Sequence, residues 1–311
     1  MKTEGSDDIV FASPIVVAET PKEAVADADV VVISVPTTAH AYVAEIIGNH
    51  IRDGQTIILN PGHTGGCLEF RRELVTRNIK TKIDLCETMT LTYITRLSDE
   101  GVVQIFRKSN NILYASLPAK PNSKVESLFP NVILAKNVIE TGMNNVNAIC
   151  HPPGMILNAG WIEYTNGGFY FYKDGFTHGV SRATDALDEE RLSIMKILQI
   201  TPIRFVDLFH KIGSTSNDTG GVYEAMAASE PNRTIKSPGS LDSRYIHEDI
   251  GNGLVPMVEF ARIAGIHTPI MQSLVTLACK FNQVNYWETG RNSKRLGIDG
   301  MNAQDLLDFV T

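Results

Sequence analysis

Two polar clusters, far apart along the chain, offer acid–base and anion-binding chemistry. His151 follows Asn147 by one helical turn, which is close enough for the amide to orient the imidazole. Segment 242–250 carries Arg244 and Asp249 just before an apolar helix. An arginine fork binds a planar carboxylate, and an aspartate beside a histidine supports proton transfer. We therefore predict catalytic roles for His151 and Asp249, and substrate-binding roles for Arg244 and Asn147.

Each of these residues also has a purely structural interpretation. A lone histidine is more often a satisfied core residue than a catalytic one, and acidic residues are favoured near a helix N-terminus. The run His247-Glu248-Asp249 lacks the spacing of the zinc-binding H-E-x-x-H motif. His63, His178 and His267 have no partner that the sequence reveals. We therefore expect no metal site.

Three polar turns follow predicted strands, at Ser34–Thr38, Asn60–Gly66 and Cys86–Thr88. In an open parallel sheet, ligands bind beyond the carboxyl ends of the strands. The glycines of the second turn allow backbone amides to approach a flat ring or a phosphate closely. Each turn alone is equally well explained as a tight strand–helix connection, but three in succession favour a ligand site.

To position these turns, the first third of the chain must form a sheet flanked by helices. Runs of β-branched residues predict buried parallel strands at Val30–Val35, Thr56–Leu59 and Lys82–Leu85. Helices are predicted between them, at Pro21–Ala28, Ala39–Ile47 and Leu68–Thr76. Further strands are predicted at Ile9–Ala12 and Ile15–Ala18, and the edge strands at Val103–Phe106 and Ile112–Ser116. This alternation indicates a doubly wound α/β fold.

From about Val138 the pattern becomes helical. The predicted helices are Asn144–Glu163, Leu187–Leu198, Gly253–Ala264 and Ile270–Phe281. The fold class is therefore α/β plus all-α, with a Rossmann-like domain over residues 1–137 and a helical domain over residues 138–311.

Composition excludes several functional classes. The 311 residues suit two domains, and a net charge of −7 without a basic patch argues against nucleic-acid binding. No apolar run approaches the ~20 residues of a membrane span. The N-terminus does not resemble a secretory signal. Four widely spaced cysteines suggest reduced thiols and a cytoplasmic protein.

A dinucleotide-binding fold normally opens with a glycine-rich turn, yet no G-x-G-x-x-G is present. The chain is expected to begin after that first unit, which leaves Val30–Val35 as an unpaired apolar edge. A misplaced start, one half of a split pair and a degenerate fragment are three open explanations.

Taken in order, four motifs resemble the opine dehydrogenase family. They are Asn60-Pro61-Gly62-His63-Thr64-Gly65-Gly66, Cys86-Glu87-Thr88, Asn147…His151-Pro152 and Ser243-Arg244-Tyr245…Glu248-Asp249. The resemblance implies a Rossmann-type domain and a helical domain like the C-terminal one of 6-phosphogluconate dehydrogenase, with the active site between them. It also implies reductive condensation of a 2-oxo acid such as pyruvate with the amino group of an amino acid, using NADH or NADPH. A homodimer is a candidate assembly.

The resemblance assigns roles to single residues. His151 matches the family's catalytic histidine, Asp249 its carboxylate partner and Arg244 the residue that holds a substrate carboxylate. The residues expected to line the cofactor cleft are Val35, Pro36, Asn60, Gly62 and Glu87.

Two alternatives remain open. Under the first, the chain is a non-catalytic binding or dimerisation module, which the missing glycine-rich turn would favour. Under the second, it is another two-domain dehydrogenase, of the hydroxyacid or ketopantoate type. The second alternative lacks a lysine four residues before an asparagine early in the second domain, where Asn147 and His151 stand instead.

Overall fold

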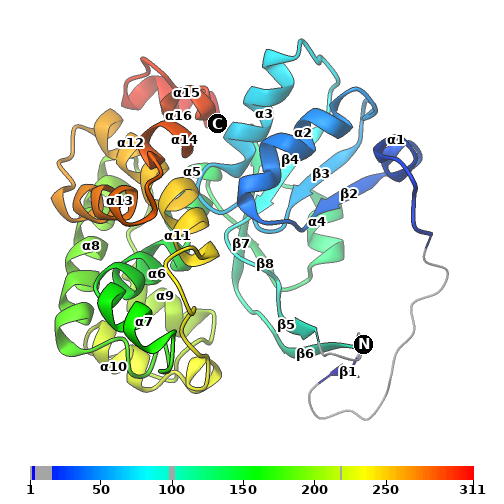
Figure 1. Ribbon diagram of the computed structural model, residues 1–311. Coiled ribbons are helices and arrows are strands. Elements are labelled where there is room, and N and C mark those ends of the chain that lie inside the picture. The colour runs from blue at the N-terminus through cyan, green and yellow to red at the C-terminus, as the bar shows by residue number, and fades with distance from the viewer. Residues whose placement is uncertain (1, 4–15, 98–101, 218) are drawn as a thin grey trace.

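The protein is represented by a computed structural model that describes residues 2–3, 16–97, 102–217 and 219–311. The predicted strand Ile9–Ala12 lies outside these residues. Figure 1 shows an α/β half, built on a sheet and drawn in blue to cyan, beside a half made of helices. The last strand of the sheet ends at Leu134, and the first helix of the second half begins at Val138.

The main sheet contains five strands. Their order is β2 (Val30–Ile33), β3 (Thr56–Leu59), β4 (Asp84–Thr88), β7 (Ile112–Leu117) and β8 (Val132–Leu134). Strands β2, β3 and β4 are parallel, as predicted, whereas β7 is antiparallel to β4 and parallel to β8. Among the described residues β2 pairs only with β3, so it forms the expected apolar edge.

The two predicted edge strands are placed differently. Strand β6 (Val103–Lys108) pairs with β5 (Tyr93–Leu97) and β1 (Lys2–Thr3) in a separate small sheet. It is the middle strand there, because β5 pairs with one of its edges and β1 with the other, so neither edge is open to the main sheet. Strand β7 is interior rather than an edge, because the unpredicted β8 pairs with its outer side.

Alternating side chains of β3 divide between the two faces of the sheet. Ile57 and Leu59 belong to the large core that includes side chains of α2 (His40–Gly48) and α3 (Gly66–Thr76). Ile58 packs in a smaller cluster with a side chain of α4 (Ser123–Leu128) on the other face. A strand buried on both faces explains the unbroken apolar run in the sequence.

The remaining helices of the α/β half are short, α1 (Pro21–Val25) and the 3₁₀ turn Thr37–Ala39. The second half contains α5 (Val138–Met143), α6 (Val146–Ile156), α7 (Ala159–Thr165), α8 (His178–Ile197), α9 (Phe205–Lys211), α10 (Val222–Ala227), the 3₁₀ turn Glu230–Asn232, α11 (Arg244–Asp249), the π-helix Ile250–Leu254, α12 (Val255–Ala264), α13 (Pro269–Asn282), α14 (Tyr286–Thr289), α15 (Ser293–Leu296) and α16 (Ala303–Val310).

The helix predicted over Asn144–Glu163 is two helices, α6 and α7. The break falls at Asn158, whose side-chain amide donates to the carbonyls of Gly154 and Gly175 at 2.8 and 3.0 Å. A side chain that bonds nearby backbone groups in this way competes with helix continuation. No described helix is long and apolar enough to cross a membrane.

Candidate active site

The structure brings His151 and Asp249 into direct contact. His151 Nδ1 lies 2.7 Å from Asp249 Oδ2, although 98 residues separate them in sequence. Both side chains are buried, at 4% and 3% exposure. In a low-dielectric interior, a carboxylate on Nδ1 fixes the ring orientation and stabilises a positive charge on the imidazole.

Helix α6 presents His151 because its start is fixed from the neighbouring half. The Asn145 side chain caps the helix by accepting from Asn147 N at 3.2 Å and Ala148 N at 3.4 Å. Its amide donates to Thr64 Oγ1 at 3.2 Å. The cap of the helix that carries His151 is therefore bonded to the turn that follows β3.

Two tyrosines complete the surroundings of His151. Tyr172 OH lies 2.7 Å from His151 Nε2, and the ring of Tyr245 stacks on the imidazole with centroids 3.8 Å apart. Burial raises the pKa of the Tyr172 hydroxyl well above its usual value, so this group stays protonated. Gly154 admits the neighbouring Phe171 ring, which a Cβ at that position would meet at 2.6 Å.

The sequence did not single out either tyrosine. Tyr245 lies next to Arg244 in the predicted cluster, which was a usable signal. Tyr172 lies in an aromatic run in the connection between α7 and α8, whose position over His151 depends on the packing of the chain.

Asp249 is the last residue of α11, and a buried π-helix, Ile250–Leu254, follows it directly. Single-turn π-helices occur often at functional sites. Asn252 of this turn places its side-chain amide 3.3 Å from Thr37 Oγ1, in the turn that follows β2. The element that carries Asp249 therefore contacts the turn after β2, just as α6 contacts the turn after β3.

Arg244, at the start of α11, is largely exposed and donates from Nε to Glu248 Oε1 at 3.0 Å. It lines a cavity of about 560 Å³ between the two halves, with Pro36 and Thr38 on the opposite wall. Asn147 lies in the first turn of α6, and its side chain forms no hydrogen bond with the described residues. His151 and Asp249 do not line this cavity; they are buried.

The five residues predicted to line a cofactor cleft follow the ends of β2, β3 and β4 or lie within them. Pro36 is exposed in the cavity wall and Val35 is half-buried. Asn60 is buried, and its amide forms 3.1 Å hydrogen bonds with the hydroxyls of Thr92 and Thr88. Cofactor binding by these residues stays a prediction.

Gly62 and Glu87 pack directly against each other. A Cβ on Gly62 would lie 2.5 Å from Glu87 Cβ, so this close approach requires glycine. Glu87 is fully buried, where it accepts hydrogen bonds from Cys67 N at 2.7 Å and Thr141 Oγ1 at 2.5 Å. Burial raises the pKa of the Glu87 carboxyl. The carboxyl therefore joins β4 to α3 and α5.

His63, expected to be unimportant, lies close to the His151–Asp249 pair. It is buried with a φ of 54°, and its Nδ1 atom has no hydrogen-bond partner among the described residues. Burial lowers its pKa to about 4; nearby Asp249 opposes this shift, and Arg291 and His151 add to it. A neutral imidazole with a free nitrogen therefore lies beside the pair.

The described residues contain no group of three or more side chains suited to a metal ion, and all four cysteines are free thiols.

Comparison with known proteins identifies the family to which the chain is related. Residues 134–282 match the family model described as NAD/NADP octopine/nopaline dehydrogenase, alpha-helical domain. The opine dehydrogenase of Arthrobacter sp. strain 1C is 32% identical over 291 residues, which cover 92% of this chain and 80% of that enzyme. Vitopine synthase of Allorhizobium ampelinum is 24% identical over 92% of this chain and 79% of its own length.

The fold agrees with these relatives. A solved octopine dehydrogenase with NADH and L-arginine superposes with a TM-score of 0.77 at 19% identity, over 94% of this chain and 81% of that one. A ketopantoate reductase from Ralstonia eutropha superposes with a TM-score of 0.59 at 14% identity, over 91% of this chain and 84% of that one. With a 32% identical relative matched over most of both lengths, the chain belongs to the opine dehydrogenase family.

Proposed function

We propose that the protein is an opine dehydrogenase that condenses a 2-oxo acid with the amino group of an amino acid and reduces the product with NADH or NADPH. The observation that carries this proposal is the buried contact between His151 and Asp249, formed where the helical half meets the strand-end turns. Family membership supplies the reaction class.

In this reaction, His151 transfers a proton, Asp249 orients it and Arg244 binds the substrate carboxylate. The neutral amino nitrogen attacks the keto carbon to form a carbinolamine, in which the former keto oxygen takes one proton from that nitrogen. A second proton, from His151 Nε2, lets this oxygen leave as water, and the protonated imine remains. For this step the keto oxygen replaces the Tyr172 hydroxyl at Nε2. Asp249 holds the ring and stabilises its positive charge. Arg244 holds the carboxylate of the 2-oxo acid through its guanidinium fork.

A nicotinamide fits the residues that are present. Pro36 and Thr38 at the carboxyl end of β2 face Arg244 across the interdomain cavity, the edge at which such sheets bind nucleotides. Val35, Asn60, Gly62 and Glu87 would shape the same edge. When bound, the nicotinamide supplies the hydride that reduces the imine.

We also propose that residues 1–137 form the domain that binds the cofactor and that residues 138–311 form the domain that binds the substrates. The four free cysteines support a cytoplasmic location, where thiols stay reduced. A homodimer stays a prediction.

The test measures NADH and NADPH oxidation with pyruvate and a panel of amino acids, for the wild-type chain and for Asp249→Asn. The amide keeps the shape of the carboxylate but removes the charge that supports an imidazolium, so kcat should fall about 100-fold or more. Asp242→Asn is the matched control, because Asp242 forms a 2.7 Å pair with His247 but is 90% exposed. We expect its kcat within about threefold of wild type.

Three outcomes would contradict the proposal. Absence of turnover with every pair of substrates would favour a binding module. Oxidation of NADH or NADPH with the 2-oxo acid alone, at a rate that no amino acid changes, would indicate a hydroxyacid-type dehydrogenase. Equal kcat values for the two variants would show that the His151–Asp249 pair takes no part in catalysis.

A further inference from the structure

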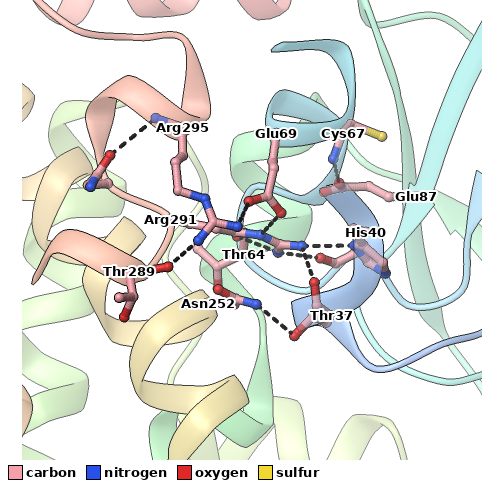
Figure 2. Close-up of polar contacts among 12 residues, drawn as sticks. Thr37, His40, Thr64, Cys67, Glu69, Glu87, Asn252, Thr289, Arg291 and Arg295 are labelled. Carbon is pink, nitrogen blue, oxygen red and sulfur yellow. Dashed lines mark hydrogen bonds and ion pairs between the residues drawn. The ribbon is translucent and has the colours of Figure 1, made fainter. Parts of the chain in front are cut away.

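Arg291 lies outside the residues that match the family model, and it is fully buried at the junction of the two halves. Figure 2 shows its guanidinium surrounded by polar groups of the α/β half. The Nε atom donates to Glu69 Oε2 at 2.8 Å. Nη1 donates to the carbonyls of Gly62 and Thr64, both at 3.0 Å.

Nη2 completes the set by donating to the Thr37 carbonyl at 3.2 Å and to His40 Nδ1 at 2.8 Å. A guanidinium has five N–H donors, and all of them are used here. Three of the five acceptors are backbone carbonyls of the turns that follow β2 and β3. These are two of the turns that we propose to line the cofactor site, and they are called the cofactor turns below.

The backbone of Arg291 is fixed to the π-helix that directly follows Asp249. Arg291 N donates to the carbonyl of Gly251, in the π-helix, at 2.8 Å. Gly290 makes this approach possible, since a Cβ there would lie 2.5 Å from the same carbonyl oxygen. One residue therefore bonds through its backbone to the turn after Asp249 and through its side chain to both strand-end turns.

The charge of Arg291 also acts on the histidines beside it. It adds to burial in lowering the pKa values of His40 and His63. His40 is therefore neutral, and its Nδ1 is an acceptor for the guanidinium. A buried guanidinium needs a carboxylate partner, and the fully buried Glu69 supplies it.

We propose that Arg291 is a positioning residue that sets the spacing between the His151–Asp249 pair and the two cofactor turns. Its side chain is fully buried, so it acts through the turns that it bonds. This inference rests on the proposed function for its kinetic consequence, while its structural consequence, ordering of the turns, is independent of any ligand.

Arg291→Lys tests the proposal, with Arg191→Lys as the matched control. Lysine keeps the charge but cannot reach several acceptors in fork geometry. Arg191 is also fully buried and bonds Asp188 and the carbonyls of Met143 and Ile203, but it touches neither cofactor turn. Both variants lose a buried arginine fork. A difference between them in the exchange rates of the two turns therefore comes from the bonds of Arg291 to those turns.

Two readouts are measured. Amide hydrogen exchange without cofactor should accelerate about tenfold or more over residues 34–39 and 60–66 in Arg291→Lys, and stay at the wild-type rate there in Arg191→Lys. In turnover, Arg291→Lys should raise KM for the nicotinamide cofactor about tenfold while KM for the 2-oxo acid stays within about twofold. Glu69→Gln weakens the ion pair that orients the same guanidinium, so it should shift both readouts in the same direction. It is the substitute variant if Arg291→Lys does not fold.

Wild-type exchange in the two turns of Arg291→Lys or Glu69→Gln would overturn the proposal, as would equal acceleration in Arg191→Lys. The exchange readout remains valid even if the wild-type chain oxidises no NADH or NADPH, a result that would defeat only the proposed function. Wild-type turnover with an unchanged cofactor KM in the variants would defeat only the role of Arg291.

Discussion

His151 and His63 are buried imidazoles a short distance apart, and their ring nitrogens meet different surroundings. Both nitrogens of His151 have partners, a carboxylate and a hydroxyl. His63 Nδ1 has none among the described residues, and burial holds its pKa near 4. The unfolded chain, in contrast, protonates this residue near pH 6.5.

This difference predicts a pH dependence of stability. Between pH 6.5 and about 4, His63 is neutral in the folded chain and protonated in the unfolded chain. The unfolded state then binds more protons, so the free energy of unfolding falls as the pH falls, by on the order of 3 kcal/mol for this one group. His63→Asn, which tolerates the same positive φ, removes this contribution. Urea unfolding at a series of pH values measures the difference.

The exposed His178 provides the control, since His178→Asn should leave the wild-type curve unchanged. If the His63→Asn and wild-type curves stayed parallel from pH 6.5 to 4, His63 would not be neutral in the folded protein.

At the scale of elements, the start of α6 links helix stability to the placement of His151. Asn145→Ala removes the cap and the bond to Thr64, and Asn302→Ala removes a cap of the same type from α16. Each should cost about 1 kcal/mol of unfolding free energy. Only Asn145→Ala should also lower kcat, by about tenfold, because it frees His151 relative to the turn after β3. Urea unfolding and steady-state kinetics measure both quantities.

Equal kcat values in these two variants would show that the contact with Thr64 does not position His151. Their unfolding free energies would still report the caps, so a structural effect and a catalytic effect remain separate in this comparison.

Elements with a strong local pattern were predictable from the sequence. The continuous β-branched run gave Thr56–Leu59 with its observed bounds. Strand β4, predicted at Lys82–Leu85, begins two residues later and ends three residues later, because its polar end, Glu87 and Thr88, is buried by contacts that the pattern does not show. Strand β5 and the π-helix were not predicted. The strand formers Tyr93-Ile94-Thr95 were a usable signal for β5, whereas the π-helix has no distinctive local signal.

The candidate site was predictable only where motifs carried it. Family resemblance placed His151 and Asp249 together, and the structure brings them into contact. Tyr172 and Arg291 were missed because their partners are chosen by packing; Arg291 and Gly62, for example, are 229 residues apart in sequence.

At the scale of the whole molecule, the end of the described chain returns to the α/β half (Figure 1). The guanidinium of Arg71, on α3, lies 4.5 Å from the ring centroid of Phe309, and the carbonyl of Val310 accepts from Ala119 N at 3.0 Å. Leu306 and Val310 are fully buried. Helix α16 therefore covers the α/β half, although the sequence places it in the helical one.

Deleting residues 303–311 should consequently weaken the α/β half first. Burial of each large aliphatic side chain contributes about 1.5–3 kcal/mol, so the loss of α16 should lower the melting temperature and accelerate amide exchange in α3. Helix α8 packs against α6, α10 and α13 within the helical half, and it should exchange at the wild-type rate. Deletion of the exposed Thr311 alone is the control and should change neither measurement. Acceleration in α8 equal to that in α3 would mean that α16 stabilises the molecule as one cooperative unit rather than the α/β half in particular.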